Sequence, residues 1–80
     1  MHYVYLLESL SCGDQRYIGV SVDLRRRLAA HNAGKSKHTA KYRPWKLVAY
    51  LAFTDRKRAF AFEQYLKSGS GYAFAAKRLW

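Results

Sequence analysis

The chain has 80 residues, of which 50% are hydrophobic and 16% aromatic. A chain of this length holds one domain with a modest core, and its composition excludes a disordered arm. Fifteen Lys and Arg residues against five Asp and Glu residues give a net charge of +10, which favours a polyanionic partner, above all nucleic acid. We therefore expect a single domain over residues 1–80 that works on one basic surface.

Cysteine content and the termini predict the compartment. The lone Cys12 cannot form an internal disulfide and has no second thiol for a zinc site, which favours the reducing cytoplasm. The apolar run near the N-terminus is too short for a signal peptide, and no stretch has the length of a membrane span. We expect a cytoplasmic protein and leave its oligomeric state open. Attraction to the ribosome or to an anionic membrane surface is a weaker alternative.

The first elements form a β-hairpin. Tyr3–Glu8 and Arg16–Ser21 are both rich in β-branched and aromatic residues, and a polar stretch separates them. Because side chains alternate along a strand, Tyr5 and Tyr17 can share one face of the sheet.

A helix and a third strand follow the hairpin. Ser21 or Asp23 can cap a helix that runs to about Asn32, and residues 35–43 have the composition of a loop. The apolar run Trp45–Phe53 predicts a third strand, which we place at the centre of the sheet.

Two further helices complete the chain. Thr54 or Asp55 begins the first of them, and Gly69 and Gly71 are expected to end it. Residues 72–79 then form a short last helix. The element order is ββαβαα, so the predicted class is α+β: a small three-stranded, mostly antiparallel sheet flanked by helices.

The first helix carries two polar residues on its inner face. With Leu24 at the centre of the apolar stripe, Leu28 and His31 lie about 40° and 20° away, and Arg27 about 60° away. Arg27 and His31 are thus one turn apart on one face. They either form part of a site, or Arg27 lays its stem over the sheet edge and His31 is a hydrogen-bonded boundary residue.

The second helix carries an acid beside its apolar stripe. Glu63 lies about 40° from Ala59 and is the only acid within a predicted helix interior. A carboxylate near buried surface is costly unless a cation compensates it. The sequence leaves two partners open, namely a structural pair with Arg27 and a metal ion.

These residues together carry a resemblance. Tyr3-Val4-Tyr5, Tyr17-Ile18-Gly19, Arg27 eight residues after that glycine, and Glu63 follow one another in the order seen in the GIY-YIG nuclease family. The likeness covers nearly the whole chain. With its segment Leu66–Gly71 and its basic C-terminal end, the sequence is similar to the short stand-alone bacterial members.

The resemblance implies a site and a chemistry. Tyr5 and Tyr17 correspond to the family's active-site tyrosines, Arg27 to its catalytic arginine and His31 to the His or Tyr one turn later. Glu63 corresponds to the glutamate that binds Mg²⁺ or Mn²⁺. In this chemistry water attacks phosphorus, and a tyrosine takes part in proton transfer.

Two positions depart from the family pattern. Val20 stands where some members carry a basic residue, and Ala75 lies near the place of an asparagine found in many active members. We therefore keep two hypotheses. One is a metal-dependent endonuclease, of the kind used in DNA repair. The other is a noncatalytic nucleic-acid-binding domain on the same scaffold.

The predicted loop before the third strand mixes cations with aromatic residues, as in surfaces that neutralise phosphates and stack on bases. The inward packing of Tyr42 and Trp45 is the alternative for its aromatic residues. No element resembles a base-reading helix, so we expect structure-selective or nonspecific binding, to DNA rather than RNA. The predicted contacts are Lys35, Lys37, His38, Lys41, Tyr42, Arg43 and Lys46.

Overall fold

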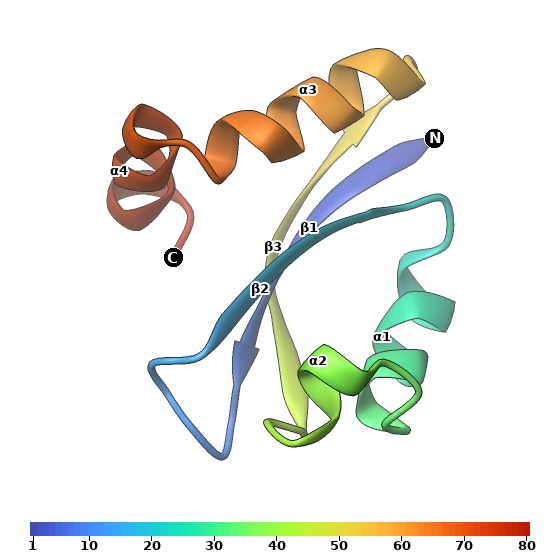
Figure 1. The fold of residues 1–80 in the computed structure, drawn as a ribbon. Coiled ribbons are helices and arrows are strands. Elements are labelled where there is room, and N and C mark those ends of the chain that lie inside the picture. Colours follow the sequence, from blue (N-terminus) through green and yellow to red (C-terminus); the bar gives the residue numbers. More distant parts are fainter.

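The computed structural model describes all residues, 1–80, and has the expected α+β class (Figure 1). None of its helices has the length and apolar character needed to cross a membrane. The elements are β1 (His2–Ser9), β2 (Arg16–Ser21), α1 (Leu24–Asn32), α2 (Lys37–Ala40), β3 (Trp45–Phe53), α3 (Arg56–Leu66) and α4 (Gly69–Arg78). The order is therefore ββααβαα, with one short helix more than predicted.

The three strands form an antiparallel sheet in the order β2-β1-β3. The prediction that Trp45–Phe53 is the central strand was wrong, because β1 pairs with both other strands and β3 lies at an edge. Consistent with its central place, residues 4–7 of β1 are buried in succession. A buried run of this kind requires cover on both faces of the sheet.

Helices provide that cover in two layers. Figure 1 shows α1 and α2 on one side of the sheet and α3 and α4 on the other. Because successive strand residues face opposite sides, β1 contributes to two cores. On the α3–α4 side the buried residues are Val4, Leu6, Ala59, Leu66 and Ala75. On the α1 side they are Tyr5, Leu7 and Trp45, with Leu24 and Leu28 packed against them.

The start of α4 was predicted three residues too late. Ser68 caps this helix, since its Oγ accepts a hydrogen bond from the Gly71 amide, and Gly69 and Gly71 lie in its first turn. A Cβ on Gly71 would collide with the backbone carbonyl of Tyr65 in α3. Gly71 therefore permits the close approach of the two helices and does not end the first one.

The predicted loop over residues 35–43 contains α2, which was missed because four residues are too few to show a helical period. Its Thr39 carbonyl accepts a hydrogen bond of 2.8 Å from Trp45 Nε1, and Trp45 is only 4% exposed. Trp45 therefore packs inward and is not a surface for stacking bases. Asn32 Oδ1 also accepts a hydrogen bond from the Trp45 amide, which ties the end of α1 to the start of β3.

Candidate active site

Two tyrosines and a glycine share the sheet face under α1. Tyr5 is paired with Gly19 across the β1–β2 ladder, and Leu7 is paired with Tyr17, so these side-chain positions lie on one face as predicted. Tyr5 is 1% exposed. A Cβ on Gly19 would lie 2.5 Å from Tyr5 Oη. The glycine thus makes room for the Tyr5 hydroxyl.

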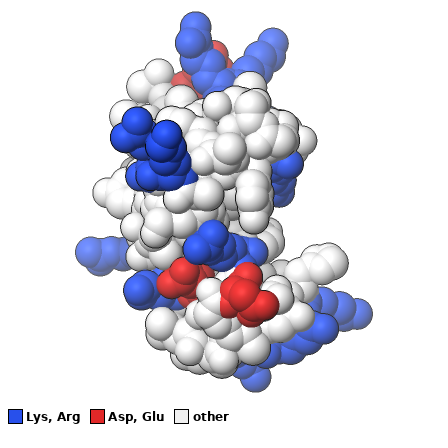
Figure 2. Space-filling view, turned by 90° about the vertical axis from the view of Figure 1, so that its left-hand side faces the viewer, with Lys and Arg blue, Asp and Glu red and all other residues white.

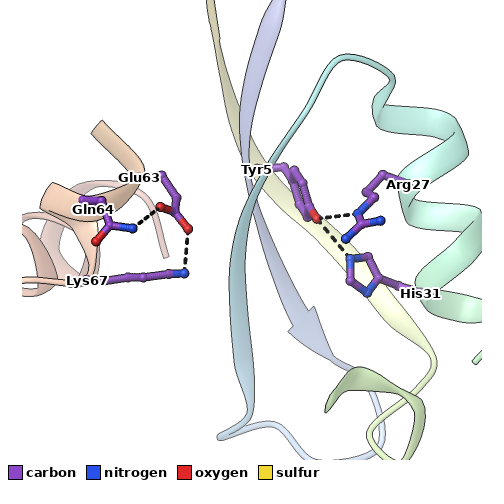
Figure 3. A network of polar contacts seen from close by, with 6 residues as sticks. All are labelled: Tyr5, Arg27, His31, Glu63, Gln64 and Lys67. Atoms are coloured by element: carbon purple, nitrogen blue, oxygen red, sulfur yellow. Dashed lines mark hydrogen bonds and ion pairs between the residues drawn. The ribbon is translucent and has the colours of Figure 1, made fainter. Parts of the chain in front are cut away.

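A chain of hydrogen bonds connects Tyr5 to α1 and α2 (Figure 3). Arg27 Nε lies 3.2 Å from Tyr5 Oη, Tyr5 Oη lies 3.0 Å from His31 Nε2, and His31 Nδ1 lies 2.8 Å from Thr39 Oγ1. One arrangement gives every proton an acceptor. In it Arg27 donates to Tyr5, Tyr5 donates to Nε2, Nδ1 donates to Thr39, and Thr39 donates to the Ser36 carbonyl. His31 is then a neutral imidazole that carries its proton on Nδ1.

The surroundings of these groups favour the same protonation states. Burial lowers the pKa of His31, and the Arg27 charge lowers it further. Burial raises the pKa of Tyr5, partly offset by its hydrogen bond with Arg27. The hydrogen bond to Tyr5 raises the pKa of Arg27. At neutral pH the cluster therefore holds a neutral phenol, a neutral imidazole and one permanent positive charge.

Tyr17 and Trp45 enclose the cluster from the side. The Tyr17 ring centroid lies 4.9 Å from that of His31 and 6.5 Å from that of Trp45. Tyr17 is half-buried and Arg27 is exposed. The side chains that reach solvent here are thus an aromatic ring and a guanidinium, which together can receive a phosphate.

Glu63 lies in the other layer, on α3. It is 8% exposed, and its Oε2 accepts a hydrogen bond of 2.6 Å from Lys67 Nζ, while Oε1 accepts one of 2.9 Å from Gln64 Nε2. Figure 3 shows Glu63 across β2 from Tyr5, Arg27 and His31. The structure therefore brings four of the five predicted catalytic residues together, with Glu63 apart from them. The alternative of an Arg27–Glu63 pair was wrong, because Lys67, one helical turn away, supplies the cation.

Comparison with known proteins identifies the family. Residues 1–73 match the family described as the GIY-YIG catalytic domain. The chain belongs to the GIY-YIG family. Relatives include UPF0213 proteins of Streptococcus pneumoniae, 43% identical over 67 residues, and of Lactococcus lactis, 40% identical over 68 residues. These matches cover 81% and 82% of this chain but 65% and 66% of those relatives, so the chain spans about two thirds of their length.

Other relatives of this GIY-YIG chain match more of their own length. A UPF0213 protein of Cupriavidus pinatubonensis is 35% identical over 79 residues, which cover 94% of this chain and 86% of that protein. The solution NMR structure of the UPF0213 protein BH0048 from Bacillus halodurans is 34% identical, with a TM-score of 0.56, and the match covers 95% of this chain and 82% of that one. The fold predicted from the GIY-YIG resemblance is thus confirmed.

GIY-YIG nucleases typically use a divalent metal, and Glu63 is the residue here that could hold one. No group of three or more His, Cys, Asp or Glu residues lies together anywhere in the chain, at Glu63 included. One carboxylate fits an ion such as Mg²⁺ that keeps several waters and takes phosphate oxygens as further ligands. The Lys67 ammonium on Oε2 shows that the site accepts a cation, and a metal ion would have to replace it.

The basic segment of this GIY-YIG chain surrounds α2. Its cations are exposed, and Lys41 Nζ lies 5.2 Å from the centroid of the half-buried Tyr42 ring. Gly34 has a φ of 78°, and a Cβ there would collide with the Arg43 guanidinium. Since α2 also provides Thr39 to His31, the segment lies beside the Tyr5 cluster. The exposed members are Lys35, Lys37, His38, Lys41, Arg43 and Lys46.

Three contributing residues were missed from the sequence. A glycine inside a strand marks a place where another group packs closely against the backbone. The packing role of Gly19 could therefore have been predicted from the sequence, in addition to its place in the motif. Lys67, four residues after Glu63, had the spacing of a helical ion pair. Thr39 had no signal, because its contact with His31 depends on how α2 folds back.

Proposed function

We propose that the protein is a metal-dependent endonuclease that hydrolyses phosphodiester bonds in nucleic acid, in DNA rather than RNA. The observation that carries the proposal is the series of hydrogen bonds from Arg27 through Tyr5 and His31 to Thr39. In it the phenol oxygen of Tyr5 contacts both a charged guanidinium and a neutral imidazole. Phosphodiester hydrolysis needs a group that holds the phosphate charge and a group that accepts a proton from water. This cluster contains both.

The roles follow from the hydrogen-bond directions. The guanidinium of Arg27 binds phosphate oxygens as charge builds on them. Tyr5 Oη, which is buried in the free protein, takes the proton of the attacking water once the substrate has brought that water to it, and passes its own proton to Nε2 of His31. The raised pKa of Tyr5 is compatible with this relay, because the phenolate need not accumulate. Glu63, which lies across β2 from this cluster, would hold Mg²⁺ or Mn²⁺ together with water and phosphate oxygens, and the ion would supply charge neutralisation there.

Substrate binding is assigned to the basic residues around α2. A net charge of +10 on a domain of this size implies several phosphate contacts and release of counterions. No element here carries a base-reading helix, so the substrate is chosen by its shape or with little selectivity. Affinity should therefore fall steeply between about 50 and 200 mM salt.

A specific observation favours a second candidate, a domain that binds nucleic acid without cutting it. Glu63 is already neutralised by Lys67, and Ala75 is 1% exposed within the core, so no polar group projects from that position. Such a domain binds the phosphates of nucleic acid through its cations and does not cleave them.

One experiment separates these candidates. The purified protein is incubated with labelled duplex, flap, junction and single-stranded substrates, with and without Mg²⁺ or Mn²⁺. We expect metal-dependent cleavage that Arg27→Ala reduces by roughly 10²–10³-fold, with a smaller loss of affinity. Binding without cleavage of any substrate would establish the second candidate instead.

A further inference from the structure

A groove lies between β2 and the α3–α4 helices, on the sheet face opposite Tyr5. It encloses about 260 Å³. Two cations and two aromatic rings line it above an aliphatic floor, a combination that nothing in the catalytic proposal uses. The cations are Arg16 and Lys67, the rings are Tyr72 and Trp80, and the floor includes Ile18 and Leu66.

The two rings differ in how they are held. Trp80 packs against the core, and the Arg16 guanidinium lies 4.7 Å from its ring centroid. Tyr72, in contrast, is 68% exposed. An aromatic ring that projects into solvent beside two cations has its face free for a flat ligand. The groove therefore has a fixed wall at Trp80 and an open wall at Tyr72.

We propose that this groove binds one unpaired nucleotide of a nucleic-acid strand, an inference that rests on the proposed function and adds a feature of its substrate. The base stacks on Tyr72, and the adjoining phosphates contact Lys67 and Arg16. The sequence-independent stacking of bases on aromatic rings suits a domain without base-reading groups.

The hollow between α1 and β3 is less suited to a polyanion than this groove. The hollow between α1 and β3 is larger, about 410 Å³, and contains Tyr3 and Tyr50. Its only cation, Arg25, is accompanied by the carboxylate of Asp23. The groove at Tyr72 has two cations and no acid among its lining residues. Arg16 pairs with Glu8 and Lys67 with Glu63 outside the lining, so a phosphate backbone competes with these two carboxylates for the cations.

The groove also adjoins Glu63 through Lys67. The Lys67 ammonium now binds Glu63, and a phosphate in the groove would compete for it. A strand that occupies the groove therefore leaves the carboxylate free for a metal ion. Figure 2, which faces the α4 side of the molecule, shows separate groups of Lys and Arg side chains on a mostly uncharged surface, with Asp and Glu side chains beside some of them.

Tryptophan fluorescence tests the proposal directly. The chain has two tryptophans, and Trp45 is buried, so a ligand in the groove changes the emission of Trp80. We expect a single-stranded oligothymidylate to quench this emission, and Trp80→Phe to remove the signal. Tyr72→Ala should weaken single-strand binding roughly 10-fold, with blunt-duplex affinity unchanged, while Tyr72→Phe binds as the parent does.

Tyr50→Leu is the matched control, because Tyr50 is a similarly exposed tyrosine, 54% against 68%, outside the groove. It should leave single-strand affinity and quenching unchanged. Thermal unfolding confirms that each variant is folded, and Tyr72→Leu repeats the test if Tyr72→Ala is not. Parent-like single-strand affinity in folded Tyr72→Ala or Tyr72→Leu, or no quenching in the parent, overturns the proposed nucleotide groove. Metal-dependent cleavage by the same protein would leave the proposed function standing. A parent protein that binds no nucleic acid at all overturns both.

Discussion

The two sides of the sheet hold their polar groups by different kinds of contact. On the α1 side, the hydrogen bonds join residues distant in sequence: Tyr5 to Arg27, Tyr5 to His31 and His31 to Thr39. On the α3 side, Glu63 is bonded only to Gln64 in its own helix and to Lys67, the residue that caps the C-terminal end of that helix. The first set forms only when the tertiary structure forms, whereas the second can form within an isolated helix.

This difference indicates which side is rigid. Moving Tyr5 or His31 would break several linked bonds in a buried cluster, so the α1 side is preorganised for its ligand. The Lys67 side chain is 50% exposed, whereas that of Glu63 is 10% exposed, so the mobile partner is the lysine and the buried carboxylate needs a cation. Glu63 can therefore exchange Lys67 for another cation. A fixed phosphate site on one side and an exchangeable cation site on the other would suit a substrate that arrives with its metal ion.

The largest expected effect comes from removing the charge of Glu63. Glu63→Gln preserves shape and the local helix but removes the carboxylate assigned to the metal ion. We expect metal-dependent turnover to fall by more than about 100-fold, while nucleic-acid affinity is unchanged or higher because a negative charge is lost. Initial rates and fluorescence anisotropy at one salt concentration measure the two quantities.

Glu8→Gln is the control for that substitution, because it makes the same charge change at a carboxylate that pairs with Arg16 at 3.8 Å. Its rate should stay close to that of the parent. Folded Glu63→Gln protein that cuts as fast as the parent would show that the activity does not depend on Glu63. The assignment of the metal ion to the α3 side of the sheet would then be wrong.

The preorganised side is probed by Gly19→Ala. The added Cβ would lie 2.5 Å from Tyr5 Oη, so either the ring or the strand must shift. Overpacking of this kind costs about 1–3 kcal/mol, and here it also displaces the hydroxyl that links Arg27 to His31. We expect a lower urea midpoint and a loss of cleavage. Gly13→Ala is the matched control, since no atom lies within 4 Å of its Cβ; equal effects of the two changes would contradict the close contact.

The sequence predicted the elements better than their arrangement. The hairpin, α1 and the third strand follow from local alternation and capping, which are visible in neighbouring residues. The central place of β1 depends on pairing with a strand some forty residues away, and hydrophobicity alone misassigned it to β3. The glycines of α4 were interpreted as helix breakers because the sequence does not show that Gly71 packs against Tyr65.

For the candidate site too, local features were predicted correctly and partners were not. Helical angles were enough to place Arg27 and His31 on the inner face of α1, and Glu63 at the border of the core. The partner of Glu63 was not predicted correctly. Arg27 and a metal ion were left open as partners and Lys67 was not considered, although its spacing of four residues from Glu63 is that of a helical ion pair and needs no tertiary structure.

A smaller effect is expected from Thr39→Val, which removes the acceptor of the His31 Nδ1 proton without changing the shape of the side chain. A buried donor left without a partner costs about 1–3 kcal/mol. Urea unfolding should show this loss for Thr39→Val and little change for Thr39→Ser, which keeps the hydroxyl. The exposed Thr54→Val serves as a control for the change in polarity. If Thr39→Val is as stable as Thr39→Ser, the bond to His31 contributes nothing to the cluster.

The smallest effect is the pH dependence that His31 gives to stability. Its folded pKa lies below the ordinary value of 6.5, first because of burial and then because of the Arg27 charge. Between these two values the unfolded chain binds more protons than the folded one, so the free energy of unfolding falls as pH decreases below about 6.5. One group gives a slope of at most about 1.4 kcal/mol per pH unit.

Urea unfolding of the parent and of His31→Gln at about pH 7.5 and 5.5 isolates this slope, because the other titrating groups are common to both proteins. We expect the stability difference in favour of the parent to shrink on acidification. A difference that stays constant, or grows, would show that His31 is not held as a buried neutral acceptor of the Tyr5 proton, and the preorganised cluster would lose its proton relay.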